Sequence, residues 1–149
     1  MNKTIIHKEA LTFIQYKIEQ LNHILQETLS ATASEDSKSS AGDKHETAVS
    51  MAQLEQEKLT TQINEYIKLK AELKSLNPEH IHHTIQKGSL IETNNGWFYL
   101  SIGLGQVKTN DISFFCISQE APLGKLLIGK SANETIEFNG RITHIINVC

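Results

Sequence analysis

The sequence predicts an α+β protein: an N-terminal antiparallel two-helix coiled-coil hairpin, followed by a small antiparallel β-sheet domain with a short helix. Two observations predict this class. Gly42 is the only glycine before Pro78, which is itself the first proline, and all other glycines follow it. At the same point the apolar pattern changes from helical spacing to short runs between turn residues. We therefore place the hairpin in residues 1–77 and the sheet domain in residues 78–149.

Two apolar series with steps of three and four residues predict helices over residues 8–34 and 45–76. The first series is Leu11, Ile14, Ile18, Leu21, Leu25 and Thr28, and the second is Val49, Ala52, Leu59, Ile63, Tyr66 and Leu73, with Gln56 and Lys70 at two core steps. Residues 34–42 contain no apolar side chain larger than alanine, which indicates a connection. Because both stripes are narrower than the faces of a compact bundle, we expect a projecting arm of about 40 Å.

The second half of the chain predicts short strands bounded by turn residues. These strands are residues 90–91, 97–102, 113–118, 136–138 and 141–148. Asn94-Asn95-Gly96 and Asn139-Gly140 are typical hairpin turns. Residues 122–129 begin with proline and end with glycine, as a short helix does.

The composition excludes several classes of protein. The net charge is −3 and no basic tail is present, which argues against strong non-specific binding to phosphates. No apolar run approaches the roughly 20 residues that cross a bilayer, and the N-terminal residues lack a signal-peptide pattern. Cys116 and Cys149 form no metal-ligand or disulfide-type spacing, so we expect a reducing cytoplasm. We also expect a monomer, without a membrane partner.

Two segments, in this order, resemble the GreA/GreB family of bacterial transcription elongation factors. Residues 42–48, Gly-Asp-Lys-His-Glu-Thr-Ala, are similar to the family's glycine-Asp-x-x-Glu-Asn-Ala element at the tip of its helical hairpin. Residues 121–130, Ala-Pro-Leu-Gly-Lys-Leu-Leu-Ile-Gly-Lys, are similar to the family's "SPI…ALIGK" segment in an FKBP-like domain. Thr47 stands in place of the family's asparagine, and Ser50 in place of an aromatic residue.

The resemblance implies a factor that inserts its hairpin into the secondary channel of RNA polymerase and acts on the backtracked RNA 3′ end. Such a factor is not an enzyme itself, because it stimulates cleavage by the polymerase's own active site. The resemblance assigns Asp43 and Glu46 as the catalytic and metal-binding residues. The cofactor it implies is Mg²⁺ shared with the polymerase, with none bound tightly by the free protein.

The resemblance also implies that the FKBP-like domain docks on the polymerase at the rim of the channel. Pro122, Leu123, Gly124 and Lys125 are the partner-binding residues that we expect, within the wider candidate surfaces 88–105 and 122–130.

Asp43 and Glu46 have two physical interpretations that stay open. Residues three apart share one face of a helix, and Mg²⁺ prefers oxygen ligands, often one or two carboxylates completed by phosphate and water. The same spacing is also a capping box, with Asp43 at the N-cap and Glu46 at the third helical position.

Three other functions remain as alternatives. A secondary-channel regulator of the same architecture would modulate or inhibit polymerase without cleavage, and the changes at Thr47 and Ser50 leave this open. A prolyl isomerase would need an aromatic-lined pocket, for which this domain has few aromatic residues. A coiled-coil adaptor would dimerise through residues 8–76, although Gln56 and Lys70 weaken that stripe.

The remaining candidates have structural interpretations. His80, His82 and His83 cluster in a stretch that we expect to be an exposed polar linker, because metal binding would need further ligands nearby. Cys116 lies in an apolar strand and is expected in the core. Cys149 has no role that the sequence indicates.

The charge generates a first prediction. At physiological salt the protein should bind free DNA or RNA weakly, because a net charge of −3 releases few counterions from phosphates. Filter binding with labelled single- and double-stranded oligonucleotides would measure this. Tight binding to naked nucleic acid would contradict the interpretation of the chain as a polymerase-binding protein.

Overall fold

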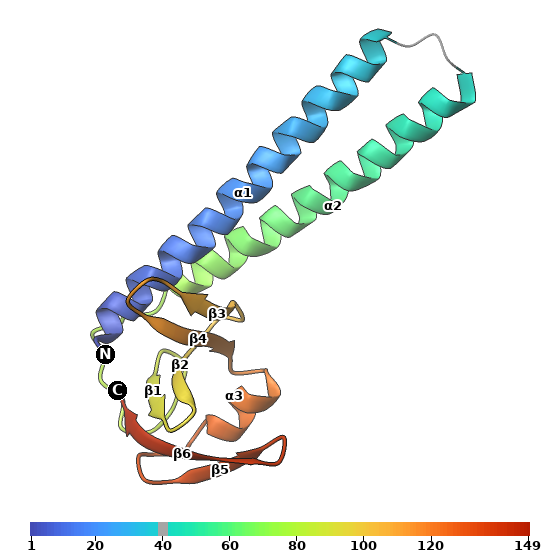
Figure 1. Ribbon diagram of the computed structural model, residues 1–149. Helices are drawn as coiled ribbons and strands as arrows, with labels where there is room; N and C mark the ends of the chain where they lie inside the picture. The colour runs from blue at the N-terminus through green and yellow to red at the C-terminus, as the bar shows by residue number, and fades with distance from the viewer. Residues whose placement is uncertain (39–41) are drawn as a thin grey trace. The chain divides into compact units, whose positions relative to one another are not determined.

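The computed structural model describes residues 1–38 and 42–149, with side chains for residues 1–31 and 49–149 (Figure 1). Two long helices, α1 (Lys3–Lys38) and α2 (Gly42–Lys74), precede all the strands. The chain forms two compact units, one of Met1–Phe13 with Ala71–Cys149 and the other of residues 14–70. The first turns of α1 and the last turn of α2 therefore belong to the sheet's unit, whereas the predicted boundary at residue 77 assigned them to the hairpin.

The two helices confirm the predicted hairpin, and α1 begins five residues earlier than expected, at Lys3 instead of residue 8. Asn2 explains this start, because its Oδ1 accepts a hydrogen bond from the backbone N–H of Thr4 at 2.8 Å, as N-cap side chains do. No glycine or proline interrupts the following residues, so the helix continues through them.

Within residues 14–70 the predicted apolar stripe is the core. Ile14, Ile18, Leu59 and Ile63 are buried. Lys70 stands at a core step, and its ammonium donates a hydrogen bond to the side-chain oxygen of Gln15 on the facing helix. None of the helices in the described ranges is long and apolar enough to cross a membrane.

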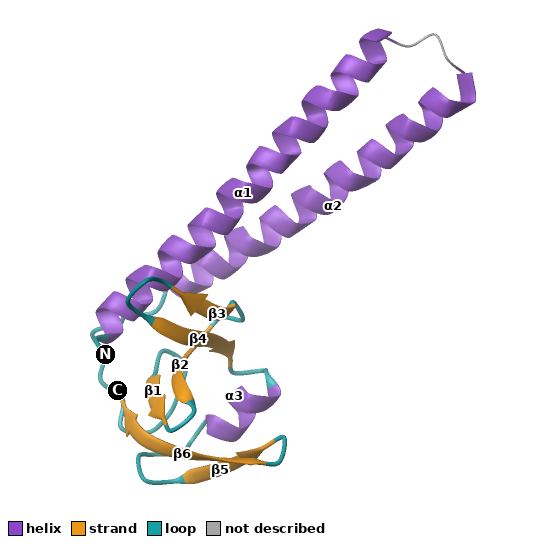
Figure 2. Ribbon diagram, in the orientation of Figure 1, coloured by secondary structure: helices purple, strands orange, loops and turns teal. Residues whose placement is uncertain are grey.

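The sheet contains six strands, in the order β3-β4-β2-β1-β6-β5 (Figure 2). The strands are β1 (Leu90–Thr93), β2 (Gly96–Ser101), β3 (Gly105–Lys108), β4 (Ser113–Ser118), β5 (Thr135–Phe138) and β6 (Arg141–Val148). The short helix α3 (Pro122–Leu127) stands between β4 and β5 in the chain. This architecture confirms the predicted α+β class and both predicted hairpins.

One expectation about the sheet was wrong: it is mixed, not purely antiparallel, because β2 and β4 pair in parallel. The reason is the unpredicted strand β3, which has a single buried side chain, Val107. The chain leaves β2, runs back through β3 at the edge of the sheet, and returns as β4 between the two. Because the prediction lacked β3, it contained no return segment between β2 and β4, and these two strands were expected to pair antiparallel.

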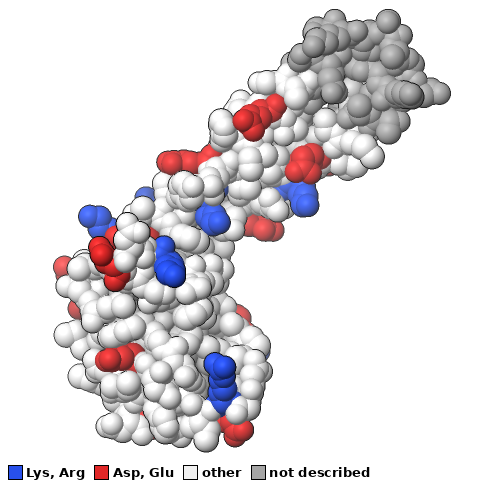
Figure 3. All heavy atoms as spheres, in the orientation of Figure 1, with Lys and Arg blue, Asp and Glu red and all other residues white. Residues whose placement is uncertain are grey.

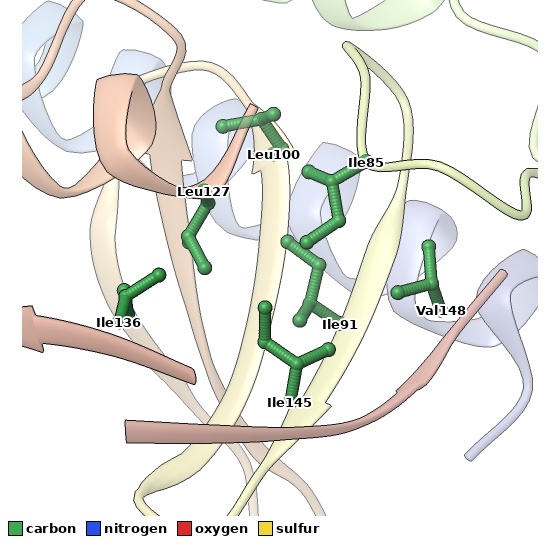
Figure 4. Packing of buried hydrophobic residues seen from close by; sticks show 7 residues of the cluster. All are labelled: Ile85, Ile91, Leu100, Leu127, Ile136, Ile145 and Val148. Carbon is green, nitrogen blue, oxygen red and sulfur yellow. The ribbon is translucent and has the colours of Figure 1, made fainter. Parts of the chain in front are cut away.

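One face of the sheet packs on α3. Its buried cluster consists of Ile85, Ile91, Leu100, Leu127, Ile136, Ile145 and Val148. Figure 4 shows these side chains gathered between α3 and the strands, with Leu127 coming from the helix. The alternation of strand side chains explains why β1, β2, β5 and β6 each contribute to this face.

The opposite face of β1 and β2 packs on the first turns of α1. Leu90 and Tyr99 pair across these two strands, and both are fully buried. From α1, Ile6 and Ala10 are equally buried, and His7 Nδ1 lies 2.8 Å from the Tyr99 hydroxyl. The sheet is thus covered on both faces at its centre, which a small sheet requires to bury enough apolar surface.

Gly124 holds α3 close to the end of β4. A Cβ atom at this position would lie 2.1 Å from the carbonyl oxygen of Ser118 and 3.1 Å from the Cα atom of Gln119. Both of these are backbone atoms, which cannot move aside as a flexible side chain would. Gly124 is buried as a result, and its role in the fold is to permit this contact.

Substitution of Gly124 by alanine tests this contact. We expect Gly124→Ala to lower the free energy of unfolding by about 1–3 kcal/mol, as overpacking of a well-packed site does. Urea denaturation followed by the fluorescence of Trp97, the only tryptophan, would measure it in the sheet's unit. The matched control is Gly103→Ala, since a Cβ there meets nothing within 4 Å. Equal effects of the two substitutions would show that the contact at Gly124 is unimportant.

Candidate functional site

The acidic pair Asp43 and Glu46 lies at the start of α2. Since the helix begins at Gly42, Asp43 is its second residue and Glu46 its fifth. Both residues therefore lie in the first two turns of α2, which leaves the capping-box and the metal-binding interpretations open. The side chains of residues 32–48 are outside the described residues, so the metal-binding role stays a prediction.

The hairpin places this pair beside the connection between its two helices. Residues 39–41, which join α1 to α2, are outside the described residues, and Gly42 follows them directly. The opposite ends of both helices belong to the sheet's unit. The acidic pair therefore lies at the end of the hairpin where its two helices are connected.

The predicted partner-binding residues of α3 divide into exposed and packed positions. Pro122 and Lys125 are exposed, whereas Leu123 is half-buried against the cluster beneath α3 and Gly124 is buried. The structure adds two exposed apolar residues that the sequence analysis had only within a wider range, Leu126 and Ile128, each 40% exposed. The exposed residues of α3 and of the position that follows it are consequently Pro122, Lys125, Leu126 and Ile128.

The other candidate surface, residues 88–105, is mostly interior. It contains β1 and β2, and its exposed residues are concentrated in the turn at Asn94-Asn95 and in the loop that leads to β3. Asn95 Nδ2 donates to the Thr143 hydroxyl at 2.8 Å, so even this turn is fixed to β6. A partner that touches this range would meet its turns and not its strands.

A buried polar cluster joins α1 to the chain between α2 and β1. Lys3 and His7 are buried, although both are polar. The Lys3 ammonium donates to the backbone carbonyl of His80. His82 Nδ1 lies 2.9 Å from the Ser89 hydroxyl, whose oxygen also accepts the backbone N–H of Gln86. Among the described residues, no buried side-chain polar atom lacks a hydrogen-bond partner.

This cluster corrects the expectation for the histidines of the linker. His80 and His83 are exposed as expected, but His82 is half-buried and fixed to Ser89. The sequence contained no signal for this contact, because the partners belong to a loop and a turn without a periodic pattern. In the described part of the chain, no group of three or more His, Cys, Asp or Glu residues could hold a metal ion.

Burial decides the protonation of these groups. It lowers the pKa of His7, and it lowers the pKa of His82 together with the nearby charges of Lys3 and His80. Burial also lowers the pKa of the Lys3 ammonium and raises that of the Tyr99 hydroxyl. A neutral His7 facing a protonated Tyr99 is therefore the stable pair, with the hydroxyl able to donate to Nδ1.

The cysteines behave as core and surface residues. Cys116 is buried in β4, as predicted, and burial raises the pKa of its thiol to about 12, against a smaller opposing effect of a hydrogen bond with Ser101. Such a thiol is protonated and unreactive at neutral pH. Cys149 is half-buried and unpaired by any disulfide.

Charges of both signs are interspersed on the face of the molecule in Figure 3. Lysines and arginines do not gather there into a broad basic patch. This distribution agrees with the small net charge, and that face lacks the basic patch that a nucleic-acid-binding surface has.

No family model and no curated protein matches the chain. Among solved structures, that of the transcription factor Gfh1 aligns with 93% of this chain and 92% of its own length, at 16% sequence identity and a TM-score of 0.35. An alignment with so low a TM-score supports no statement about function. The functional argument therefore depends on the residues and on the architecture of this chain.

The buried histidines generate a prediction about pH. An unfolded histidine has a pKa of about 6.5, and the folded values of His7 and His82 are lower. Above that pH both states are neutral, and below it the unfolded chain binds more protons, so the free energy of unfolding should fall as the pH falls below about 6.5. Urea titrations between pH 7.5 and 5.5, followed by Trp97 fluorescence, would measure this.

Two variants make the pH experiment specific. His7→Gln removes a titrating group while keeping a side chain that can bond to Tyr99, so part of the pH dependence should disappear. His23→Gln is the control, because the His23 side chain is 75% exposed on α1. If the wild-type free energy of unfolding does not change over this range, the histidines are not buried in solution as they are in this structure.

Proposed function

We propose that this protein is a transcription factor that binds RNA polymerase through the secondary channel and stimulates Mg²⁺-dependent cleavage of backtracked RNA. The observation that supports this most is the position of Asp43 and Glu46. They lie in the first turns of the second helix of a two-helix arm, next to the connection between the helices. The resemblance of this segment to the cleavage element of GreA/GreB factors, which lies at the tip of their hairpin, supports the proposal.

The dimensions of the arm suit this role. Residues 14–38 of α1 extend about 40 Å at the helical rise of 1.5 Å per residue. The buried stripe is narrow, since its described core consists of single apolar residues a turn apart, such as Ile18 on α1 and Ile63 on α2. Two helices held by one stripe make a thin arm, which a channel can admit more readily than a bundle.

The acidic pair would act only within the complex. Two carboxylates supply a minority of the oxygen ligands that Mg²⁺ requires, so the polymerase and the RNA phosphate would supply the others. When bound, Mg²⁺ would supply an activated water and stabilise the leaving oxygen. Asp43 and Glu46 would contribute negative charge beside the Mg²⁺ of the polymerase, and the two helices would carry these carboxylates into the channel.

The sheet domain would hold the factor on the polymerase. The exposed residues of α3 and of the position that follows it, namely Pro122, Lys125, Leu126 and Ile128, form a mixed apolar and basic surface. Gly124 lets α3 pack closely on the end of β4, and Leu123 packs on the cluster beneath it, so α3 has a defined position on the sheet. A preformed surface of this kind loses little entropy when a partner docks.

A second candidate function is regulation of the polymerase without cleavage. It is favoured by Thr47 and Ser50, where the chain departs from the family element that it resembles. Both functions need the same arm and the same docking, and they differ only in what the acidic pair does inside the channel.

The decisive experiment substitutes the two carboxylates by their amides. Asp43→Asn and Glu46→Gln keep the shape of each side chain and remove the charge that Mg²⁺ requires. We expect cleavage of RNA in a purified, backtracked cognate polymerase complex to fall by orders of magnitude, while thermal stability changes by less than about 1 kcal/mol. Binding to polymerase should stay nearly intact.

Glu65→Gln is the control, because Glu65 is an exposed carboxylate elsewhere on α2. If the amide variants cleave at the wild-type rate, Asp43 and Glu46 are structural. If the wild-type protein binds polymerase and alters transcription without shortening the RNA, the second candidate function is correct.

A further inference from the structure

Part of the sheet face opposite α3 is uncovered. Side chains alternate between the faces of a strand, so those of Glu92 and Trp97 share the face of Leu90 and Tyr99, which pack against α1. We call the uncovered part the outer patch. It consists of Glu92, Trp97, Thr135, Glu137, Ile142, His144, Ile146 and Asn147.

The outer patch exposes large apolar side chains. Ile142 is 61% exposed and Ile146 is 52% exposed, whereas their neighbours Ile145 and Val148 are buried on the α3 side. Ile142 is exposed by the regular alternation of β6, where it lies opposite Glu137 of β5. Ile146 is exposed because the β1–β6 pairing shifts between Glu92 and Thr93, which leaves Ile146 as the extra residue of β6. Trp97 is half-buried beside them.

The spacing of the strands favours a helix as the group that covers this patch. The first turns of α1 contact β2 through Tyr99, and β6 is two strands away from β2. Two strand separations are roughly 10 Å. Helices that pack side by side lie about 8–10 Å apart. The distance from β2 to β6 therefore matches the spacing between two packed helices, and a second helix beside the first turns of α1 would be at the distance of β6.

The charges favour a basic helix. On the outer face, β1, β2, β5 and β6 present Glu92 and Glu137 and present neither lysine nor arginine. Glu137 lies directly opposite Ile142 in the β5–β6 pair. A second copy of the chain would bring four glutamates together, which like-charge repulsion disfavours.

We propose that the outer patch is a docking site for an amphipathic helix with basic flanks, supplied by a partner protein. The site is on the face of the sheet opposite α3, so it is separate from the surface assigned above to polymerase docking. It does not depend on the proposed function, and both surfaces can be occupied at once. Ile142 and Ile146 are the apolar anchors, and Glu92 and Glu137 orient the helix.

The test uses a synthetic 18-residue helical peptide of leucine and lysine in an amphipathic pattern, with the full-length protein. Because the peptide lacks tryptophan, the emission of Trp97 reports binding at the patch directly. We expect saturable binding, with amide chemical shifts changing on β1, β5 and β6. Ile142→Ser or Ile146→Ser should weaken binding at least about tenfold, as loss of a buried apolar anchor does.

Three controls decide the outcome. Leu54→Ser, at an apolar residue of α2 that is 65% exposed, should bind the peptide as the wild type does. Glu137→Gln should weaken binding and reduce its dependence on salt. A leucine–glutamate peptide of the same pattern should not bind.

Equal binding of the acidic peptide, or no effect of Ile142→Ser, would overturn the proposal. So would self-association of the free protein, seen by sedimentation velocity and lost in Ile142→Ser, because the patch would then be covered by a second copy.

Discussion

The fold depends on the packing of the first turns of α1 against the sheet. A sheet of six short strands must bury both of its faces at the centre, and α3, with six residues, covers only one. Ile6 and Ala10 of α1 close the other face over Leu90 and Tyr99. The first helix is therefore shared: its first turns complete the core of the sheet's unit, and the rest of it forms half of the arm.

A buried polar contact gives this packing its specificity. Apolar residues alone would allow α1 to rotate or slide on the sheet, because the hydrophobic effect has no direction. The hydrogen bond between His7 and Tyr99, and the bond from Lys3 to the carbonyl of His80, each require one position of the helix. Their cost is the burial of ionisable groups, and the lowered pKa of His7 and Lys3 expresses that cost.

The arm and the sheet's unit follow different physical rules. In the arm, a single stripe of apolar residues holds two helices, and polar residues at core steps are accommodated by contacts such as that of Lys70 with Gln15. The sheet's unit has a deep core on one face and a partly open face on the other, so it offers surfaces for partners.

The sequence by itself determined the elements whose signals are local. The steps of three and four fixed both long helices, Asn139-Gly140 fixed the last hairpin, and the proline and glycine around α3 fixed the short helix. The sequence also predicts a role for Asp43 and Glu46, from their spacing and from the resemblance of their segment, and that role stays a prediction.

Only the tertiary structure decided the features that depend on contacts between remote segments. Strand β3 was missed because Val107 is its only buried side chain, and the parallel pairing of β2 and β4 follows from it. The apolar pattern of the sequence also gave no signal for three further features. They are the attachment of His82 to Ser89, the close approach that requires Gly124, and the bulge that exposes Ile146. The physical reason is that periodicity records which face of an element is apolar, whereas the partner that covers that face is chosen by the packing of the whole chain.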